Sequence, residues 1–427
     1  MERVNIAFLG FGTVGTGAYK IICNNGDTIL NSDGIRLNVV KVLVGNIHKK
    51  RSICLPEGVL TDRFEDIIED DSIRIVAEFI GGEYPAKNYI EQCLRKGKTV
   101  VTANKEVIAK HGLYLTKLAK EHGCGLLFEA SSVGAVPVIR IIRESLQANK
   151  ISKIMGIING TTNYILTKMA EEDLSFETAL QQAQDLGYAE PDPTADVEGY
   201  DALYKLSILS SLAFQTQVRV EDIYREGITK ISKEDIQYAK ELGYAVKLAA
   251  IAKKTEDGIE ARVHPTFIPE KHPLASVRDS FNAVFINGDA IGEMMFYGQG
   301  AGDMPTGSAI VSDILHACQN PCGGNFLDVV KSNSIRVTDN WKTAFFIRMT
   351  VMDKPAVLHA ISGCFARHNV SLWTVVQKGS GDGHSKKTVP LIFITHEAEE
   401  REMRAALEDI ANVKEVTEIN CCIRVEK

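Results

Sequence analysis

The feature that most constrains the fold of this chain is a glycine-rich turn close to its start. Residues 4–23 read VNIAFLGFGTVGTGAYKIIC, in which an apolar, strand-like run leads through the pattern GxGxxG into a helical segment. In this context the backbone N–H groups at the start of the helix can bind a pyrophosphate. The sequence therefore predicts a dinucleotide site at Gly10, Gly12, Thr13, Val14 and Gly15, and the alternative is an ordinary glycine-rich turn.

The segments that follow this turn predict a parallel sheet. Apolar runs rich in β-branched residues occur at 37–45, 73–82, 98–104 and 125–131, and helical stretches separate them. Such alternation is typical of an α/β domain with crossover helices, in which ligands bind at the carboxyl ends of the strands. We therefore predict a Rossmann-type domain over residues 1–135.

The rest of the chain predicts two further domains. Residues 136–325 combine a strand-like segment with helices and mixed stretches, which predicts an α+β domain whose last helix packs back on the first domain. Helix breakers concentrate in CQNPCGGN at 318–325 and predict a connector. Residues 343–427 follow a β-α-β-β-α-β order, which is that of the ferredoxin-like split βαβ motif.

Charge and hydropathy favour a small-molecule partner. The chain has 427 residues and a formal net charge of -7, which gives no overall attraction for nucleic acid or an anionic membrane. Its start lacks the zones of a secretory signal, and no apolar run approaches the ~18 residues of a membrane span. We therefore expect a cytoplasmic protein.

The end of the second predicted strand bears on the choice of cofactor. NAD-binding domains usually have an Asp or Glu there, which binds the ribose, but this chain has Gly45 and Asn46. Lys49, Lys50 and Arg51 follow, and basic side chains favour the 2′-phosphate of NADP. The alternative is a solvated basic loop, so the sequence favours NADP and leaves NAD possible.

The second segment that carries chemistry is GYAEPDPTADVEGYDALYK at 187–205, with five carboxylates and one lysine. Pro191 and Pro193 keep its first half out of a helix. The ligand spacing of an EF-hand is absent, and no His or Cys accompanies the carboxylates as a zinc site would require. The choice left open is between a solvated loop and a polar pocket, in which Glu190 could bind a substrate ammonium group.

The second half of this segment predicts a helix from about residue 200 to 214. Asp201 and Lys205 lie four residues apart on one face, which continues with Ile208, Leu209 and Leu212 and should therefore turn toward a core. A surface salt bridge is the alternative, but charged groups on an apolar face are costly unless they are paired and used. The pair places a proton donor beside an acceptor, as carbonyl reduction requires.

The whole pattern from Ala183 to Lys205 resembles the signature of homoserine dehydrogenases. Further motifs lie where that family has them: GFGTVG at 10–15, VVTANKE at 100–106, FEASSVGAVPVI at 128–139, GIINGTTNYIL at 156–166 and GQGAGDMPTGSAI at 298–310. The resemblance covers essentially residues 1–320, and we expect no aspartate-kinase domain before it. The unit at 343–427 is similar to an ACT domain, a regulatory module that often binds amino acids.

The resemblance implies an activity and roles for named residues. The family interconverts L-homoserine and L-aspartate 4-semialdehyde with NAD(P), on the route to threonine, isoleucine and methionine. Lys205 would be the acid/base, and Lys105 would lie between nicotinamide and substrate. Asp201 and Glu190 would hold the substrate, with Asp196 in the polar network, and Gly187 and Gly302 would lie near the cofactor.

The resemblance also implies a metal ion, an effector and an oligomer. A sodium ion would bind backbone oxygens of Glu129, Ser132, Gly134 and Val136, with Ser132 where a valine is common. The ACT-like turn has Ala356 where many amino-acid-binding members have glycine, which could narrow the approach of an effector to the backbone, and threonine stays a possible effector. The domain at 136–325 would carry catalysis and dimerisation, in a homodimer or homotetramer.

A different class of function remains as an alternative. The chain could be a catalytically silent amino-acid sensor that has kept the nucleotide fold and the ACT-like unit. The intact set of Lys105, Asp201 and Lys205 argues against such a loss of catalysis.

Overall fold

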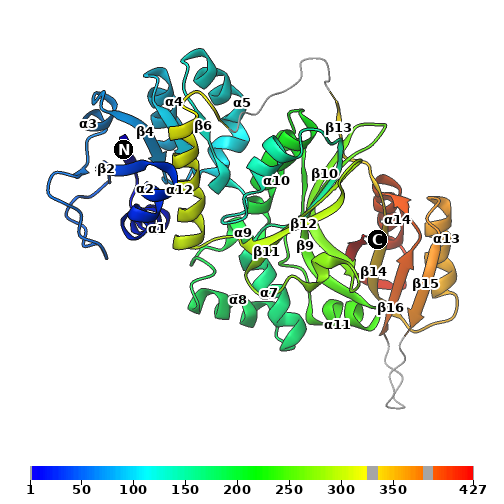
Figure 1. Ribbon diagram of the computed structural model, residues 1–427. Coiled ribbons are helices and arrows are strands. Elements are labelled where there is room, and N and C mark those ends of the chain that lie inside the picture. Colours follow the sequence, from blue (N-terminus) through cyan, green and yellow to red (C-terminus); the bar gives the residue numbers. More distant parts are fainter. Residues whose placement is uncertain (1, 325–334, 378–387, 427) are drawn as a thin grey trace. The chain divides into compact units, whose positions relative to one another are not determined.

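The computed structural model describes residues 2–324, 335–377 and 388–426 (Figure 1). The chain forms two compact units, each built from three separate stretches. The first contains Met1–Ile154, Asp201–Glu221 and Phe281–Ile335, and the second contains Met155–Tyr200, Asp222–Ser280 and Arg336–Lys427. The predicted domain ends at residues 325 and 427 lie outside the described residues.

A six-stranded parallel sheet forms the core of the first unit, in the order β3-β2-β1-β4-β5-β6. The strands are β1 (Glu2–Leu9), β2 (Ile35–Leu43), β3 (Leu60–Thr61), β4 (Ile73–Glu78), β5 (Thr99–Thr102) and β6 (Leu126–Leu127). Its helices are α1 (Thr13–Asn24), α2 (Gly26–Asp33), α3 (Glu65–Ile68), α4 (Ala86–Arg95) and α5 (Lys105–Glu121). The five predicted strands are confirmed, and β3, which has two residues, was not predicted.

A helix from near residue 310 completes this unit. α12 (Asp303–Gln319) packs on α1, and two glycines permit the close approach (Figure 1). A Cβ atom at Gly17 would collide with the backbone of Asp303, and one at Gly307 would lie 2.6 Å from the backbone nitrogen of Ala18. Glycine is therefore required on both helices at their crossing.

The remaining elements of the first unit follow the sheet or come from later in the chain. They are a 3-10 turn (Glu129–Ser131), α6 (Val138–Arg140), a π-helical turn (Ile141–Ser145), α10 (Tyr200–Phe214), a 3-10 turn (Val220–Asp222) and the antiparallel strands β11 (Phe281–Gly288) and β12 (Gly292–Gln299). β7 (Ile151–Ile157) crosses the point where the two units divide.

The second unit begins with helices and an antiparallel strand pair. Its first elements are α7 (Gly160–Glu171), α8 (Phe176–Asp185), α9 (Thr194–Val197), β8 (Tyr224–Arg225), α11 (Lys233–Glu241), β9 (Tyr244–Lys254), β10 (Ile259–Pro269) and a 3-10 turn (Pro273–Ser276). β9 and β10 pair over their full length. No helix in the described part of the chain is both long and apolar enough to cross a membrane.

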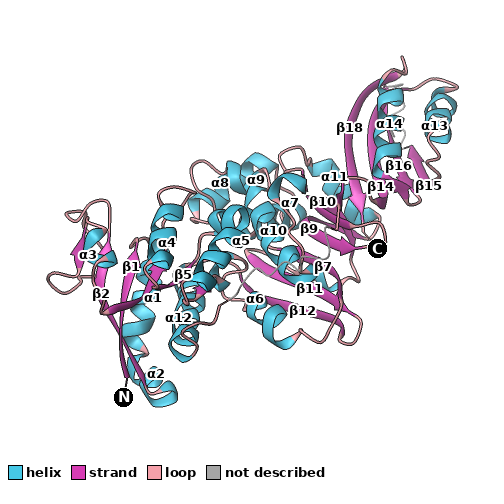
Figure 2. Cartoon of the chain, turned by 90° about the horizontal axis from the view of Figure 1, so that it is seen from above, coloured by secondary structure: helices cyan, strands magenta, loops and turns pink. Residues whose placement is uncertain are grey.

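The C-terminal part of this unit has the predicted β-α-β-β-α-β order, with one short strand added. After β13 (Val337–Thr338) come β14 (Lys342–Met352), α13 (Val357–Arg367), β15 (Leu372–Gln377), β16 (Thr388–Thr395), β17 (Ala398–Glu399), α14 (Glu400–Ala411) and β18 (Val416–Val425). The sheet order is β18-β14-β16-β15, with antiparallel neighbours. α13 and α14 pack over one face of this sheet (Figure 2).

The C-terminal sheet does not stand apart from the rest of its unit. β18 pairs with β10 in parallel, through Thr266 with Arg424 and Phe267 with Val425. Next to this pairing, the fully buried guanidinium of Arg262 donates to Glu426 over 2.6 Å. The last strand of the chain is therefore part of the core around β10.

The turn that leads into α13 holds a non-glycine residue in the left-handed region. Ala356, the N-cap of α13, has φ 70 and ψ -4. This conformation costs an alanine roughly 1–2 kcal/mol relative to ordinary backbone. The position therefore suits glycine better than the alanine that occupies it.

Candidate active site

The glycine turn after β1 has the geometry of a phosphate cradle. Gly10 has φ +101, and a Cβ atom at Gly15 would lie 2.9 Å from the carbonyl oxygen of Gly10. Gly12 is the N-cap of α1, and nothing lies within 4 Å of its Cβ position. The first turn of α1 has no acidic residue and no side-chain cap, so the N–H groups of Thr13 and Val14 can face an anion. These residues fit a dinucleotide.

The three basic residues after β2 differ in their contacts. The guanidinium of Arg51 donates to the carbonyl oxygens of Asn46 over 2.6 Å and of Lys49 over 2.7 Å, so it closes the loop on itself. Asn46 also accepts from the backbone N–H of His48, over 2.8 Å. Lys49 and Lys50 are exposed. Two of the three predicted cations therefore face solvent at the carboxyl end of β2.

The centre of the candidate site is a carboxylate held by two lysines. α10 spans Tyr200–Phe214, which confirms the predicted helix. Lys205 Nζ lies 2.7 Å from Asp201 Oδ2, and Lys105 Nζ, from the start of α5, lies 2.7 Å from Asp201 Oδ1. The side chain of Asp201 is 6% exposed and that of Lys205 is 10% exposed. The pair therefore faces the interior, as the apolar stripe predicted.

Burial and charge make this cluster suited to an anion. One carboxylate shared by two ammonium groups leaves a net charge of about +1, and at low dielectric such a charge acts strongly on its surroundings. The Lys105 side chain is 41% exposed, so the cluster reaches the surface on that side. An oxygen that gains negative charge beside it would be stabilised. The contact between Lys105 and Asp201 had no signal in the sequence, because 96 positions separate them (201 minus 105).

The predicted substrate-side residues lie in the second unit. Glu190 is exposed, and Asp196 accepts a hydrogen bond of 2.6 Å from Asn159 Nδ2. Asn159 also caps α7 by accepting from the N–H of Thr162. Gly187 has φ +76 just beyond the end of α8, where a left-handed residue ends a helix well. The structure thus brings together Lys105, Asp201 and Lys205, whereas Glu190, Asp196 and Gly187 belong to the other unit.

The segment after β6 is buried and rich in backbone oxygens. Glu129 O accepts from Ser132 N over 3.4 Å, and Val136 O accepts from Val138 N over 2.8 Å. Each carbonyl keeps a second lone pair, and the buried Ser132 hydroxyl has no hydrogen-bond partner among the described residues. The described residues hold no cluster of three or more His, Cys, Asp or Glu that could bind a metal. An oxygen-only site for a hard cation such as sodium fits this segment.

The Glu129 side chain points away from this segment into a buried ionic cluster that the sequence did not reveal. Its carboxylate accepts from Ile139 N and Arg140 N, at 2.8 Å each. Arg140 donates to Asp313 over 2.7 Å, and Asp313 accepts from Glu129 N over 2.9 Å. Burial raises the pKa of Glu129 to about 8, with a further contribution from Asp313, and burial raises the pKa of Asp313 to about 6. The cluster fixes the segment to α12.

The turn GQGAG lies against the same segment. Gly302 is the N-cap of α12 and has φ 124. A Cβ atom at Gly134 would collide with the backbone of Gly300, and Ala135 N donates to the carbonyl oxygen of Gln299, at the end of β12, over 3.1 Å. Residues 299–301, which lead into Gly302 and α12, are thus in contact with the segment that contains Gly134.

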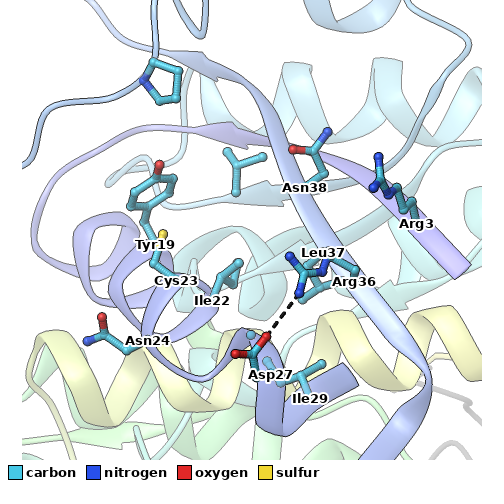
Figure 3. A pocket seen from close by; sticks show the side chains of 13 residues that line it. Arg3, Tyr19, Ile22, Cys23, Asn24, Asp27, Ile29, Arg36, Leu37 and Asn38 are labelled. Atoms are coloured by element: carbon cyan, nitrogen blue, oxygen red, sulfur yellow. Dashed lines mark hydrogen bonds and ion pairs between the residues drawn. The ribbon is translucent and has the colours of Figure 1, made fainter. Parts of the chain in front are cut away.

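A pocket of about 480 Å³ lies elsewhere in the first unit (Figure 3). It contains Arg3 and Arg36 near the amino ends of β1 and β2, and Tyr19 and Cys23 on α1. Arg36 pairs there with Asp27 over 3.1 Å. Because ligands of open α/β sheets bind at the carboxyl ends of the strands, this pocket is not the predicted nucleotide site.

Comparison with known families agrees with the two parts of the site. Residues 10–129 match the model of the homoserine dehydrogenase NAD-binding domain, and residues 137–315 match that of homoserine dehydrogenase. The homoserine dehydrogenase of Bacillus subtilis is 40% identical over 430 residues, which is 100% of this chain and 99% of that protein. That of Synechocystis is 41% identical over 436 residues, with 99% of each chain covered.

Solved structures give the same result. A homoserine dehydrogenase from Thiobacillus denitrificans superposes with a TM-score of 0.92 at 38% identity, over 100% of this chain and 99% of that one. A hyperthermophilic archaeal homoserine dehydrogenase in complex with NADPH superposes with a TM-score of 0.62 at 27% identity. The match covers 74% of this chain and 98% of the archaeal chain. Since full-length relatives at this identity are enzymes of one kind, the chain belongs to the homoserine dehydrogenase family of NAD(P)-dependent oxidoreductases that act on a CH–OH group.

Proposed function

We propose that this chain interconverts L-homoserine and L-aspartate 4-semialdehyde, with NADP as its preferred cofactor. The observation that carries the proposal is the buried Asp201 carboxylate between Lys105 and Lys205. The bound dinucleotide would supply or accept the hydride at the carbonyl carbon. The alternative of a silent sensor is not favoured, because the full-length relatives are dehydrogenases.

Lys205 is the acid/base of this proposal. In aldehyde reduction its ammonium gives a proton to the oxygen that was the carbonyl oxygen, and in homoserine oxidation the neutral amine takes that proton back. Asp201, 2.7 Å away, holds the Lys205 side chain in place. Lys105 adds positive charge near the reacting oxygen.

Glu190 and Asp196 form the substrate-binding part of the proposal. A carboxylate at position 190 suits the ammonium group of the amino-acid substrate, and Glu190 is exposed in its own unit and so accessible to a ligand. Asp196 is fixed by Asn159 and would act in the polar network, and Gly187 and Gly302 would lie near the cofactor.

The exposed Lys49 and Lys50 support NADP. A 2′-phosphate gains charge-assisted hydrogen bonds from such side chains, whereas the ribose hydroxyl of NAD gains none. Arg51 takes no direct part in this proposal, because its guanidinium closes the loop.

A sodium ion on the backbone oxygens of Glu129, Ser132, Gly134 and Val136 is the proposed metal. The buried, unpartnered Ser132 hydroxyl supports it, because a cation would give that oxygen a partner. The ion would fix the segment between the nucleotide domain and the residues that follow. No proton or hydride transfer depends on it.

The C-terminal β-α-β-β-α-β part is the proposed ACT domain, with threonine as its effector. Its element order supports this assignment. The methyl group of Ala356, at the left-handed position before α13, narrows the approach of an effector to the backbone, which threonine binding would have to accommodate.

The test of these proposals is an assay of L-homoserine oxidation, followed by the absorbance of the reduced nicotinamide. We expect NADP to exceed NAD in kcat/KM by about tenfold, the effect of roughly one charge-assisted contact. Replacing both Lys49 and Lys50 by alanine should abolish this preference by raising the KM for NADP alone.

Two further measurements test the effector and the metal. Threonine should inhibit the oxidation of L-homoserine. Exchange of sodium for tetramethylammonium at equal ionic strength should lower the melting temperature of the protein.

Each part of this test can fail separately. Absence of turnover with either cofactor would refute the activity, and an unchanged preference in the double variant would refute the role of the two lysines. A melting temperature that is the same in both salts would refute the sodium site. Calorimetry that detects no heat on addition of threonine would refute the effector.

We also propose a homodimer or a higher homo-oligomer. β12, an end strand of its sheet, exposes Met294, Met295 and Tyr297, the last being 51% exposed. Adjacent apolar side chains on a strand edge are a usual site of subunit contact. Light scattering should give a mass of at least twice the 46.9 kDa of the chain, and Tyr297→Glu should reduce it. A wild-type protein that stays monomeric would contradict this proposal.

A further inference from the structure

A buried glutamate that the activity does not explain lies at the end of β4. Glu78 is 0% exposed. Its carboxylate accepts hydrogen bonds from the backbone N–H of Ile80 and from the hydroxyl of Thr102, each over 2.5 Å. The same hydroxyl accepts from the backbone N–H of Asn104, over 2.9 Å. The carboxylate thus joins the ends of two neighbouring strands, β4 and β5.

These contacts continue to Asn104, the residue that caps α5. Asn104 Nδ2 donates to the carbonyl oxygens of Ile80 and Gly82, at 2.8 Å each, and Asn104 Oδ1 accepts from Val107 N over 3.1 Å as the cap of the helix. The next residue in the chain is Lys105, whose ammonium group binds Asp201. The hydrogen-bond network of Glu78 therefore includes the turn that directly precedes Lys105.

The loop after Glu78 also touches the phosphate cradle. Phe79 N donates to Leu9 O over 2.8 Å, and the Cβ position of Gly10 lies 3.3 Å from the backbone of Phe79. The ring of Phe79 lies 3.0 Å from the Cβ position of Gly15. Residues 79–82 consequently lie between the glycine turn and the start of α5, with Glu78 at their base.

A carboxyl group at this position is costly. Burial raises the pKa of Glu78 to about 7, although hydrogen bonds from Thr102, Ile80 and Asn104 lower it. These partners are all neutral. The charged residues of the loop and the elements packed around β4 have partners of their own or lie beyond these contacts: Glu83, Lys105, Glu106, Lys110, His111, Asp303, Asp313 and His316.

We propose that Glu78 is a positioning residue of the active site, whose carboxylate holds residues 79–82 and the turn at 102–104 so that Lys105 meets Asp201 and the substrate. The inference deepens the proposed function and rests on the role of Lys105 in it. Glu78 itself touches neither substrate nor cofactor in this scheme. Ile80 and Thr102 both donate, so the position requires an acceptor of two hydrogen bonds, which the ionised carboxylate supplies and an amide does not.

The test is a double-mutant cycle of Glu78→Gln with Lys105→Ala. Glu78→Gln keeps the shape of the side chain but turns an NH₂ donor toward one of the two donors. We expect kcat to fall about tenfold in the single variant and to change less than about twofold when the substitution is made in Lys105→Ala, because contacting or coupled residues are not additive. An equal fall in both backgrounds, or no fall at all, would overturn the positioning role. If Lys105→Ala alone leaves kcat unchanged, the proposed function of Lys105 fails instead.

A matched pair in β5 separates positioning from loss of stability. Thr102→Val removes the hydroxyl that donates to Glu78, whereas Thr99→Val removes a buried hydroxyl of the same strand that bonds Pro321 O over 3.3 Å. Only Thr102→Val should lower kcat, at comparable melting temperatures. If both variants lower kcat equally, the effect is structural and the proposal is wrong.

The pH profile gives a second readout. The kcat of the wild type should fall as pH drops through about 7, where Glu78 takes up a proton, and this limb should be absent in Glu78→Gln. Protonation of Glu78 does not cause this fall in kcat by unfolding the protein. A raised folded-state pKa means that the folded chain binds more protons between the two pKa values, so the contribution of Glu78 to stability rises as pH falls. An identical limb in the variant would contradict the assignment.

Discussion

Lys205→Ala should lower kcat for aldehyde reduction by about 10²–10⁴-fold, the usual contribution of a general acid. The hydride can still reach the carbonyl carbon, but the oxygen would then bear a negative charge with no proton donor in contact. Stopped-flow or steady-state absorbance of NADPH measures the loss. Binding of NADPH, followed by its fluorescence, should stay nearly unchanged, because the glycine turn that would bind it is formed by other residues.

Two further variants decide why activity is lost. Lys205→Arg keeps a cation beside Asp201, but a guanidinium does not give up its proton at neutral pH, so turnover should remain low while substrate binding is kept. Lys87→Ala is the matched control, because Lys87 also pairs with a carboxylate at a spacing of four residues, Glu91, in the same unit. Full turnover in Lys205→Ala, or an equal loss in Lys87→Ala, would eliminate Lys205 as the acid/base.

Arg424→Met should lower the free energy of unfolding by about 3–5 kcal/mol, the cost of removing one partner from a buried ion pair. Arg424 is 6% exposed and binds both oxygens of Glu400, over 2.5 and 3.2 Å. It also donates to Glu226 and to the hydroxyl of Tyr224, from the part of the unit before β9. Methionine keeps most of the volume, so the loss measures the charge and its hydrogen bonds.

Chemical denaturation with two comparison variants tests this prediction. Glu400→Gln combined with Arg424→Met should recover part of the loss, because it removes a buried carboxylate that, among the described residues, would keep only Arg404, at 3.0 Å, as its cationic partner. Arg401→Met is the control, because Arg401 follows Glu400 on α14 but lies at the surface. Its side chain is 76% exposed, and its ion pair with Glu399 spans 3.9 Å. We expect that variant to stay within about 1 kcal/mol of wild type. A similar loss in both single variants would show that burial is not the cause.

Local patterns predicted the elements of this chain well. The glycine turn, the five predicted strands of the parallel sheet and the bounds of α10 follow from periodicity and from turn residues, which act over a few positions. The inward face of Asp201 and Lys205 could be predicted because the apolar stripe continues on the same helix. Such features depend only on neighbouring residues, so they can be predicted from the sequence.

The contacts that complete the site could not be predicted in this way. Lys105 meets Asp201 across two helices, and Glu78 meets Thr102 across two strands, at spacings set by the packing of whole elements. The division of the chain into interleaved units has the same origin: residues 201–221 of α10 and the turn after it belong to the first unit, although residues 155–200 before them belong to the second. Only the packing of the last helix on the first domain was predicted. A single buried glutamate in the apolar run IRIVAEFIGG left no periodic signal.

The pairing of β18 with β10 has a consequence for synthesis of the protein on the ribosome. The fully buried Arg262 pairs with Glu260 and with Glu426, and Glu426 follows it by 164 residues. At about 5–20 residues per second, Glu426 is made on the order of ten seconds or longer after Arg262. During this interval β10 can pair with β8 but lacks β18 and the counter-charge of Glu426, so we expect the nascent second unit to be a client for a chaperone until β18 has been made.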